Sequence, residues 1–185
     1  MKKKLSISVI ALMIILSSCE KSSIEPDIQN VSGKKSSINN GHVVLNFRAH
    51  LSGDQEVPVR ETSATGQAIF QLSKDGKELS YKLIVANLDN ISMSHIHVAP
   101  AGTNGGVVVW LYPSAPPAML IPGTTNGILK QGVITQANLV GSLAGHELSD
   151  LIDLMIDDRT YVNIHTSQFP GGEIRGQISG NVKED

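Results

Sequence analysis

The sequence predicts a mainly β protein, an antiparallel β-sandwich or flattened Greek-key barrel with one short helix. Apolar and polar residues alternate with a period of two over much of the chain after residue 42. Clusters of Gly, Pro and Asn interrupt this alternation at short intervals, as turns between strands do. One segment repeats its apolar residues at helical spacing instead. The region is long enough for a single hydrophobic core of roughly 140 residues.

The first expected strand covers residues 43–51, where every second residue is apolar. The clearest hairpin joins residues 68–72 to residues 79–85 through residues 74–77, where Asp75-Gly76 is typical of a hairpin turn. Further strands are expected near residues 92–98, 106–112, 127–134, 160–165 and 173–179. About eight short strands separated by turns favour a sandwich or barrel over an α/β fold.

The expected helix lies in residues 146–158, which read HELSDLIDLMIDD. Its apolar residues recur three or four positions apart, so they share one face of a helix; they are Leu148, Leu151, Ile152 and Met155. A helix with one apolar stripe packs that stripe on a core. We therefore expect it to cover one end of the sheets.

The first 18 residues are expected to be a lipoprotein signal peptide. Lys2, Lys3 and Lys4 precede an apolar run, residues 5–16, that is too short to cross a bilayer. Leu16-Ser17-Ser18-Cys19 resembles a lipobox, which predicts cleavage before Cys19 and lipidation of its thiol. The alternatives are ordinary cleavage nearby and a free thiol. Cys19 is the only cysteine, so no internal disulfide can form.

A flexible tether is expected over residues 19–41, followed by one domain over residues 42–181. Removal of the signal takes three of the 15 basic side chains and none of the 17 acidic ones, which leaves a net charge of −5. Such a balance argues against a nucleic-acid partner. We expect a monomeric domain anchored to the lipid bilayer through Cys19, on the periplasmic or cell-surface side of the cell envelope.

Two segments share a pattern of Ile-His, a Gly-rich loop that ends in Gly-Gly, and a β-prone run. They are SHIHVAPAGTNGGVVVW at residues 94–110 and VNIHTSQFPGGEIRG at residues 162–176. In a strand, His95 and His97 share one face, about 6–7 Å apart, while Ile96 enters the core. If the two hairpins pack side by side, His165 can join them. Three imidazoles could then bind copper or zinc.

Bracing is the other interpretation of these histidines. A neutral imidazole donates from one nitrogen and accepts at the other, so it can satisfy buried loop groups. The sequence favours bracing, and thus no cofactor, because three histidines without a clear carboxylate or thiolate partner form an incomplete metal site. Glu56 and Glu173 are the spare oxygen ligands; Glu173 alternatively pairs with Arg175 or faces solvent.

A second candidate surface is the proline-rich segment YPSAPPAMLIPGTTNG, residues 112–127. Proline excludes it from a central strand. Its apolar side chains could recognise a protein partner or fold back as a cap on the core; they are Tyr112, Met119, Leu120 and Ile121.

Several segments together closely resemble the chordin domain, or CHRD domain. They begin with RAHLSGDQEVPVRETSATGQAIF and continue with SHIHVAPAGTNGGVVVWLY, GVITQANLVG, LSDLIDLMIDDRTYVNIHT and PGGEIRGQI. The resemblance spans about residues 44–178 in a consistent order. It implies a secreted β-sandwich module, which occurs as repeats in the growth-factor antagonist chordin and singly in many bacterial proteins.

The resemblance implies no established reaction for the bacterial members. Chordin's cysteine-rich modules, which bear much of its ligand binding, do not occur in this sequence, so the growth-factor role is not carried over. No catalytic constellation is legible either. We therefore expect a non-catalytic, membrane-tethered extracytoplasmic binding or assembly module rather than an enzyme. The alternative is a periplasmic or surface protein that binds copper or zinc through its histidines.

Overall fold

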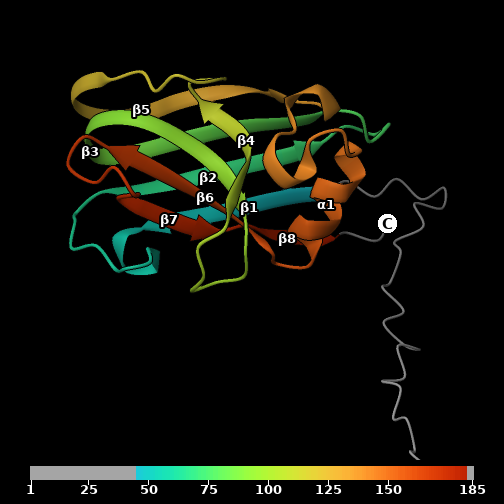
Figure 1. Cartoon of the computed structure of the whole chain (residues 1–185), viewed down its shortest axis with the longest axis horizontal. Helices are drawn as coiled ribbons and strands as arrows, with labels where there is room; N and C mark the ends of the chain where they lie inside the picture. The colour runs from blue at the N-terminus through green and yellow to red at the C-terminus, as the bar shows by residue number, and fades with distance from the viewer. Residues whose placement is uncertain (1–44, 183–185) are drawn as a thin grey trace, which may run out of the picture. The chain divides into compact units, whose positions relative to one another are not determined.

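The computed structural model describes residues 45–182 of the chain. The expected signal peptide (1–18), the lipidation site Cys19, the tether (19–41) and the first residues of the expected domain lie outside the described residues. Within them the fold is mainly β, with antiparallel strands and one α-helix, α1 (Figure 1). The predicted fold class is confirmed.

Eight strands and one α-helix make up the described region. The strands are β1 Leu45–Ser52, β2 Thr65–Leu72, β3 Leu79–Val98, β4 Gly106–Tyr112, β5 Ile121–Ile134, β6 Thr160–Thr166, β7 Ile174–Gln177 and β8 Ser179–Val182. The helix α1 is Leu148–Ile156, and short 3-10 turns occupy Gly53–Gln55, Gln136–Asn138 and Gly141–Leu143.

Five strands close into a barrel. The strand order is β2-β1-β7-β6-β3, and β3 pairs back onto β2. Closure depends on the length of β3, because its residues 79–86 pair with β2 while its residues 91–98 pair with β6. Strands β4 and β5 add to β3, and β8 adds to β1 (Figure 1).

The main difference from the sequence-based expectation lies in β3. Residues 79–85 and 92–98 were expected as two strands, and they form one strand of 20 residues. Asn87 and Asn90 have positive φ angles of 56° and 51°, and the β3–β5 pairing shifts register around them. Asparagine tolerates this conformation, so the strand bulges and bends where the alternation pattern suggested a break.

Two further boundaries differ. Strand β5 begins at Ile121 rather than near residue 127, and within the described region it pairs with β3 alone, which suits a strand that contains Pro122. The strand expected at 173–179 is divided into β7 and β8, which pair with different partners.

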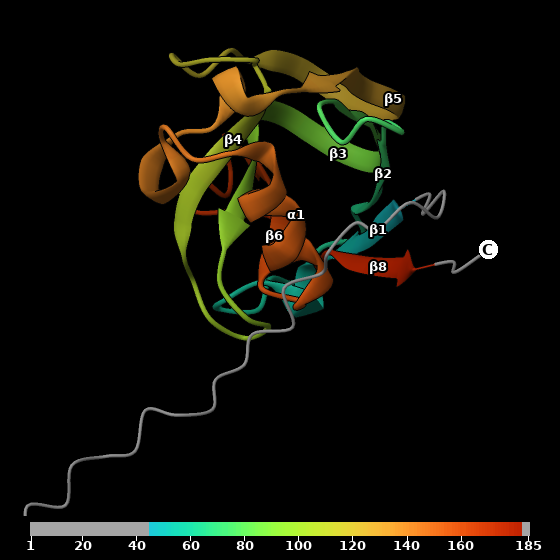
Figure 2. The same ribbon diagram turned by 90° about the vertical axis from the view of Figure 1, so that its right-hand side faces the viewer.

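The core fills the barrel interior and extends beneath the helix. Phe47, Phe70 and Leu83 are fully buried there. The helix buries its four predicted apolar residues and lies across one end of the barrel (Figure 2). No helix of the described residues is long and apolar enough to span a membrane.

Candidate metal centre

The two Ile-His segments lie side by side, because β3 and β6 are antiparallel neighbours. His95 pairs with Asn163, His97 pairs with Tyr161, and Met93 pairs with His165. The three imidazoles project from the face of the sheet opposite the fully buried Ile96. One nitrogen atom from each ring lies within 4.8 Å of the other two.

All three rings are buried although they point away from the apolar core. His95, His97 and His165 are 3%, 7% and 7% exposed. Hydrogen bonds between loops close this face: Asn104 donates to the carbonyl of Val57, and further along Arg60 and Thr62 donate to residues 172 and 173. The loops after β1, β3 and β6 thus form a second, polar layer over the sheet.

Two of the histidines brace loops through Nδ1. The Nδ1 of His97 lies 2.9 Å from the carbonyl oxygen of Gly105, and that of His165 lies 2.9 Å from the carbonyl oxygen of Pro170. A carbonyl oxygen only accepts, so each Nδ1 carries the proton and donates it. In the neutral imidazole, the Nε2 atom of each ring then keeps a free lone pair.

The remaining nitrogen atoms have few partners. The Nε2 atoms of His95 and His97 are buried and accept no hydrogen bond from the described residues. The Nε2 of His165 lies 3.2 Å from Nδ1 of His95 and 3.0 Å from Oδ1 of Asn163. Two nitrogens bound to one tetrahedral zinc ion would lie about 3.4 Å apart. The arrangement therefore matches a metal site as closely as it matches an imidazole pair.

The environment keeps the rings neutral. Burial lowers the pKa of His95 from its ordinary 6.5 to about 3, and the neighbouring His165 and His97 add to the effect. Burial also lowers the pKa values of His97 and His165, although their bonds to loop carbonyls oppose the shift. Neutral imidazole is the form that binds metal ions.

Neither candidate oxygen ligand joins the histidines. Glu173 is buried, and its two oxygens accept from the hydroxyls of Thr62 at 2.7 Å and Thr166 at 2.6 Å. The expectation that it pairs with Arg175 or faces solvent is wrong. Glu56 is also buried; its Oε2 accepts from the amide of Val57 at 3.2 Å, and its Oε1 lacks a partner among the described residues.

Arg175 is a central residue to which the sequence analysis gave no role of its own in the site. It is 1% exposed and donates to loop 99–105, at the side chain of Asn104 and the carbonyls of Pro100 and Thr103. Its guanidinium carbon also lies 3.4 Å from the centre of the Tyr161 ring, which stacks on His97. The sequence contained one signal for this role. Arg175 lies two residues after Glu173 on an alternating strand, so its side chain projects from the same face as the histidines.

The proline-rich segment divides into two parts. Tyr112 and Ile121 are half-buried and pack against the core, whereas Met119 and Leu120 are 58% and 56% exposed. Met119 is held beside β3 by a bond from its amide to the carbonyl of Ser92. The structure therefore places only two of the four side chains on the surface.

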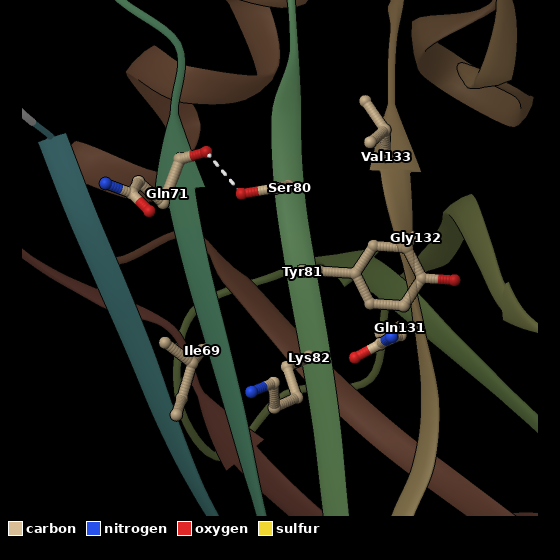
Figure 3. A pocket seen from close by; sticks show the side chains of 8 residues that line it. All are labelled: Ile69, Gln71, Ser80, Tyr81, Lys82, Gln131, Gly132 and Val133. Carbon is tan, nitrogen blue, oxygen red and sulfur yellow. Dashed lines mark hydrogen bonds between the residues drawn. The ribbon is translucent and has the colours of Figure 1, made fainter.

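A broad hollow lies away from the histidines, over β2, β3 and β5 (Figure 3). Its volume is 560 Å³, and the only charged side chain that lines it is Lys82. The Tyr81 ring lies against Gly132, where a Cβ atom would come within 2.9 Å of the ring. The hollow is thus a consequence of packing, and it gathers no groups for chemistry.

Comparison with known proteins gives one match. The model of the CHRD domain family matches residues 47–178, which is well over half of the chain. No curated protein and no solved structure matches. The matched range contains both Ile-His segments, the helix and the loops that cover the histidines.

Proposed function

The chain belongs to the CHRD domain family, and we propose that it is a non-catalytic extracytoplasmic module that binds one transition-metal ion, copper or zinc. The ligands are His95, His97 and His165. One observation carries the proposal: one ring nitrogen from each of the three buried histidines lies within 4.8 Å of the other two, and the Nε2 atoms of His95 and His97 have no partner among the described residues.

The hydrogen bonds of the rings support this role. Histidines that bind metals usually donate their other N–H to a carbonyl or carboxylate, which fixes the ring and the tautomer. His97 and His165 make such bonds to the carbonyls of Gly105 and Pro170. In His97, bracing and metal binding are therefore compatible, because bracing uses Nδ1 and leaves Nε2 without a partner among the described residues.

Loop bracing by itself does not account for the two buried Nε2 atoms that lack a partner among the described residues. A buried polar atom without a partner destabilises the fold by about 1–3 kcal/mol, and two such atoms lie on neighbouring rings here. A side chain that only held a loop could place its second nitrogen in solvent or against a donor. A metal ion bound by the cluster would give an unsatisfied imidazole nitrogen its partner.

The test is a thermal melt of the full-length chain, purified in detergent, with chelator, zinc or copper. We expect one metal ion per chain to stabilise the parent, by about 2.7 kcal/mol at 100 times the dissociation constant. His97→Gln should abolish the effect. His50→Gln, which alters an exposed histidine, should retain it. A parent protein that melts identically in all three solutions would refute the proposal.

We further propose that the module is lipidated at Cys19 and held in the cell envelope by residues 19–41. The support is the lipobox-like sequence at residues 16–19 and the position of the matched domain after it. Cys19→Ser should lose incorporation of a fatty-acid probe during metabolic labelling. Equal incorporation in the parent and the variant would contradict the anchor.

Protein recognition is a second candidate function, supported by the exposure of Met119 and Leu120 on a proline-rich segment. A double Met119→Ser, Leu120→Ser variant should then lose cross-links to envelope proteins that the parent forms. Its metal binding should not change, since neither side chain belongs to the histidine cluster. Identical cross-links in parent and variant would remove this candidate.

A further inference from the structure

The donor atoms of the histidine cluster carry no formal charge. Of the His, Cys, Asp and Glu side chains in the described residues, only three imidazoles converge. Histidine binds metal ions as the neutral imidazole. An ion that enters this site therefore brings its whole charge into a buried, low-dielectric region, and no ligand offsets that charge.

A buried positive charge beside the cluster opposes cations. The guanidinium of Arg175 lies over the Tyr161 ring, and that ring stacks on His97 with 4.8 Å between ring centres. Any bound cation is repelled by this guanidinium in proportion to its own charge.

We infer that the site selects copper(I) over zinc(II) and copper(II). The inference rests on the proposed metal-binding function and concerns the identity of the ion. The desolvation free energy of an ion grows with the square of its charge, so a dication costs about four times as much to bury as a monocation of similar size. The repulsion between Arg175 and the bound ion is also twice as large for a dication as for a monocation.

The number of donors points to the same ion. Copper(I) accepts two or three neutral nitrogen ligands without a further group. Zinc is almost always four-coordinate in proteins and would need a water or an anion beside the three imidazoles. The edge of the His95 ring contacts Trp110, with ring centres 4.2 Å apart, and loops close the rest of this face. A closed three-nitrogen cluster suits the lower coordination number.

Glu56 is a buried acidic group on which Arg175 acts. The positive charges of Arg175 and Arg60 act on its carboxylate. Burial raises its pKa, which disfavours the charged carboxylate. Glu56→Gln removes any negative charge that would help a dication, and it leaves all three ligands in place.

The experiment compares affinities of the full-length chain for two ions. Copper(I) is titrated without oxygen against a chromogenic copper(I) chelator, and zinc(II) is titrated against a chromogenic zinc chelator. We expect one ion per chain in each titration and tighter binding of copper(I) by about 100-fold or more. In Glu56→Gln the preference for copper(I) should stay the same or increase.

Two outcomes separate this inference from the proposed function. Zinc(II) that binds as tightly as copper(I), with loss of binding in His97→Gln, would overturn the copper(I) inference and leave metal binding intact. Failure of both ions to bind, or equal binding by His97→Gln, would overturn both. Copper bound to the parent should also stay silent in electron paramagnetic resonance after exposure to air, and a copper(II) signal would contradict the selectivity.

Discussion

The two Ile-His hairpins differ in what holds their loops. We call β3, loop 99–105 and β4 the first hairpin, and β6, loop 167–173 and β7 the second. Side chains of the second hairpin hold loop 99–105: Arg175 donates to three of its residues, and the Tyr161 hydroxyl accepts from the amide of Gly105. Loop 167–173 makes many of its bonds within its own hairpin, through Thr166, Phe169 and Pro170, and its outside bonds come from Arg60 and Thr62 and go to Asn90 rather than to the first hairpin's loop.

This difference shows how one sequence pattern can serve two purposes. The histidine that follows isoleucine in each copy, His97 or His165, donates to its own loop, so the bracing role is shared. The first position differs: it is His95 in β3 and Asn163 in β6. This asymmetry gives the first hairpin two potential ligands. A separate difference is that the loop of the first hairpin depends on side chains of the second hairpin.

The largest expected effect comes from Arg175→Met. The change removes the Arg175 donors from three acceptors in loop 99–105, of which the Pro100 carbonyl keeps a bond from the Thr103 amide. It also removes the buried positive charge that acts on Glu56. We expect a loss of about 3–5 kcal/mol in the free energy of unfolding. Amide exchange should increase in loop 99–105 more than in loop 167–173. Arg48→Met, at an exposed position of β1, is the control and should stay within about 0.5 kcal/mol.

The two glycines of each Gly-Gly pair should differ in their sensitivity to alanine substitution. The more sensitive position should be the first glycine in one hairpin and the second glycine in the other. A Cβ atom on Gly105 would lie 2.0 Å from the carbonyl oxygen of Val98, and on Gly172, where φ is +121°, it would lie 2.2 Å from Oε1 of Glu56. Gly106 and Gly171 meet nothing closer than 3.9 Å. Alanine at Gly105 or Gly172 should therefore cost about 3 kcal/mol, as a severe clash does.

Alanine at Gly106 or Gly171 provides the matched controls, and each should cost less than about 1 kcal/mol. The first glycine of the pair is crowded in the first hairpin, and the second glycine is crowded in the second. Chemical unfolding of the four variants measures the pattern directly. The same order in both hairpins would contradict the geometry.

Acidic pH should destabilise the metal-free domain, because the buried imidazole of His95 binds a proton more readily in the unfolded state. The pKa of His95 is about 3 in the folded state and near 6.5 when unfolded, so the unfolded state binds more protons between these values. Stability is then present above pH 6.5 and is lost as the pH falls. We expect a loss of about 2 kcal/mol between pH 6.5 and pH 5 from this residue. In His95→Gln, unfolding in the presence of chelator should show a flatter pH dependence. An unchanged slope would show that His95 is charged in the folded state.

The sequence predicted the fold well because alternation and turns are local signals. It predicted the helix, the Asp75-Gly76 hairpin and the burial of Ile96. It did not predict that β3 continues through Asn87 and Asn90, because a bulge and a strand end have similar local composition. The order of strands around the barrel also depends on pairings between distant residues.

The site was predictable only in part. Periodicity placed His95 and His97 on one face, and the repeat indicated that His165 could join them. Their burial could not be derived, since it depends on loops that meet from three parts of the chain. The role of Arg175 depends on the same loops. The sequence suggested that Glu173 pairs with Arg175 on the same strand. Its two oxygens instead accept hydrogen bonds from the hydroxyls of Thr62 and Thr166.

Thr166→Val should loosen the second hairpin without affecting the first. The hydroxyl of Thr166 donates to Glu173 at 2.6 Å and accepts from the amide of Phe169 at 3.2 Å. Valine keeps the shape and removes both bonds, so we expect a loss of about 1–2 kcal/mol. Amide exchange should rise in loop 167–173 and stay unchanged in loop 99–105. An equal rise in both loops would show that the two loops open together.

Tyr161→Phe should have the smallest effect. It removes the hydroxyl and keeps the aromatic ring, so it separates two contributions of one residue. The hydroxyl accepts from the Gly105 amide at 3.2 Å in a partly buried setting, and a bond of this kind contributes about 0.5–1 kcal/mol. Phenylalanine keeps the ring between Arg175 and His97. The loop also retains the donors of Arg175 and the bond from His97, so urea unfolding should shift only slightly, with an unchanged m value. A loss as large as that of Arg175→Met would mean that the hydroxyl, rather than the guanidinium, orders the loop of the first hairpin.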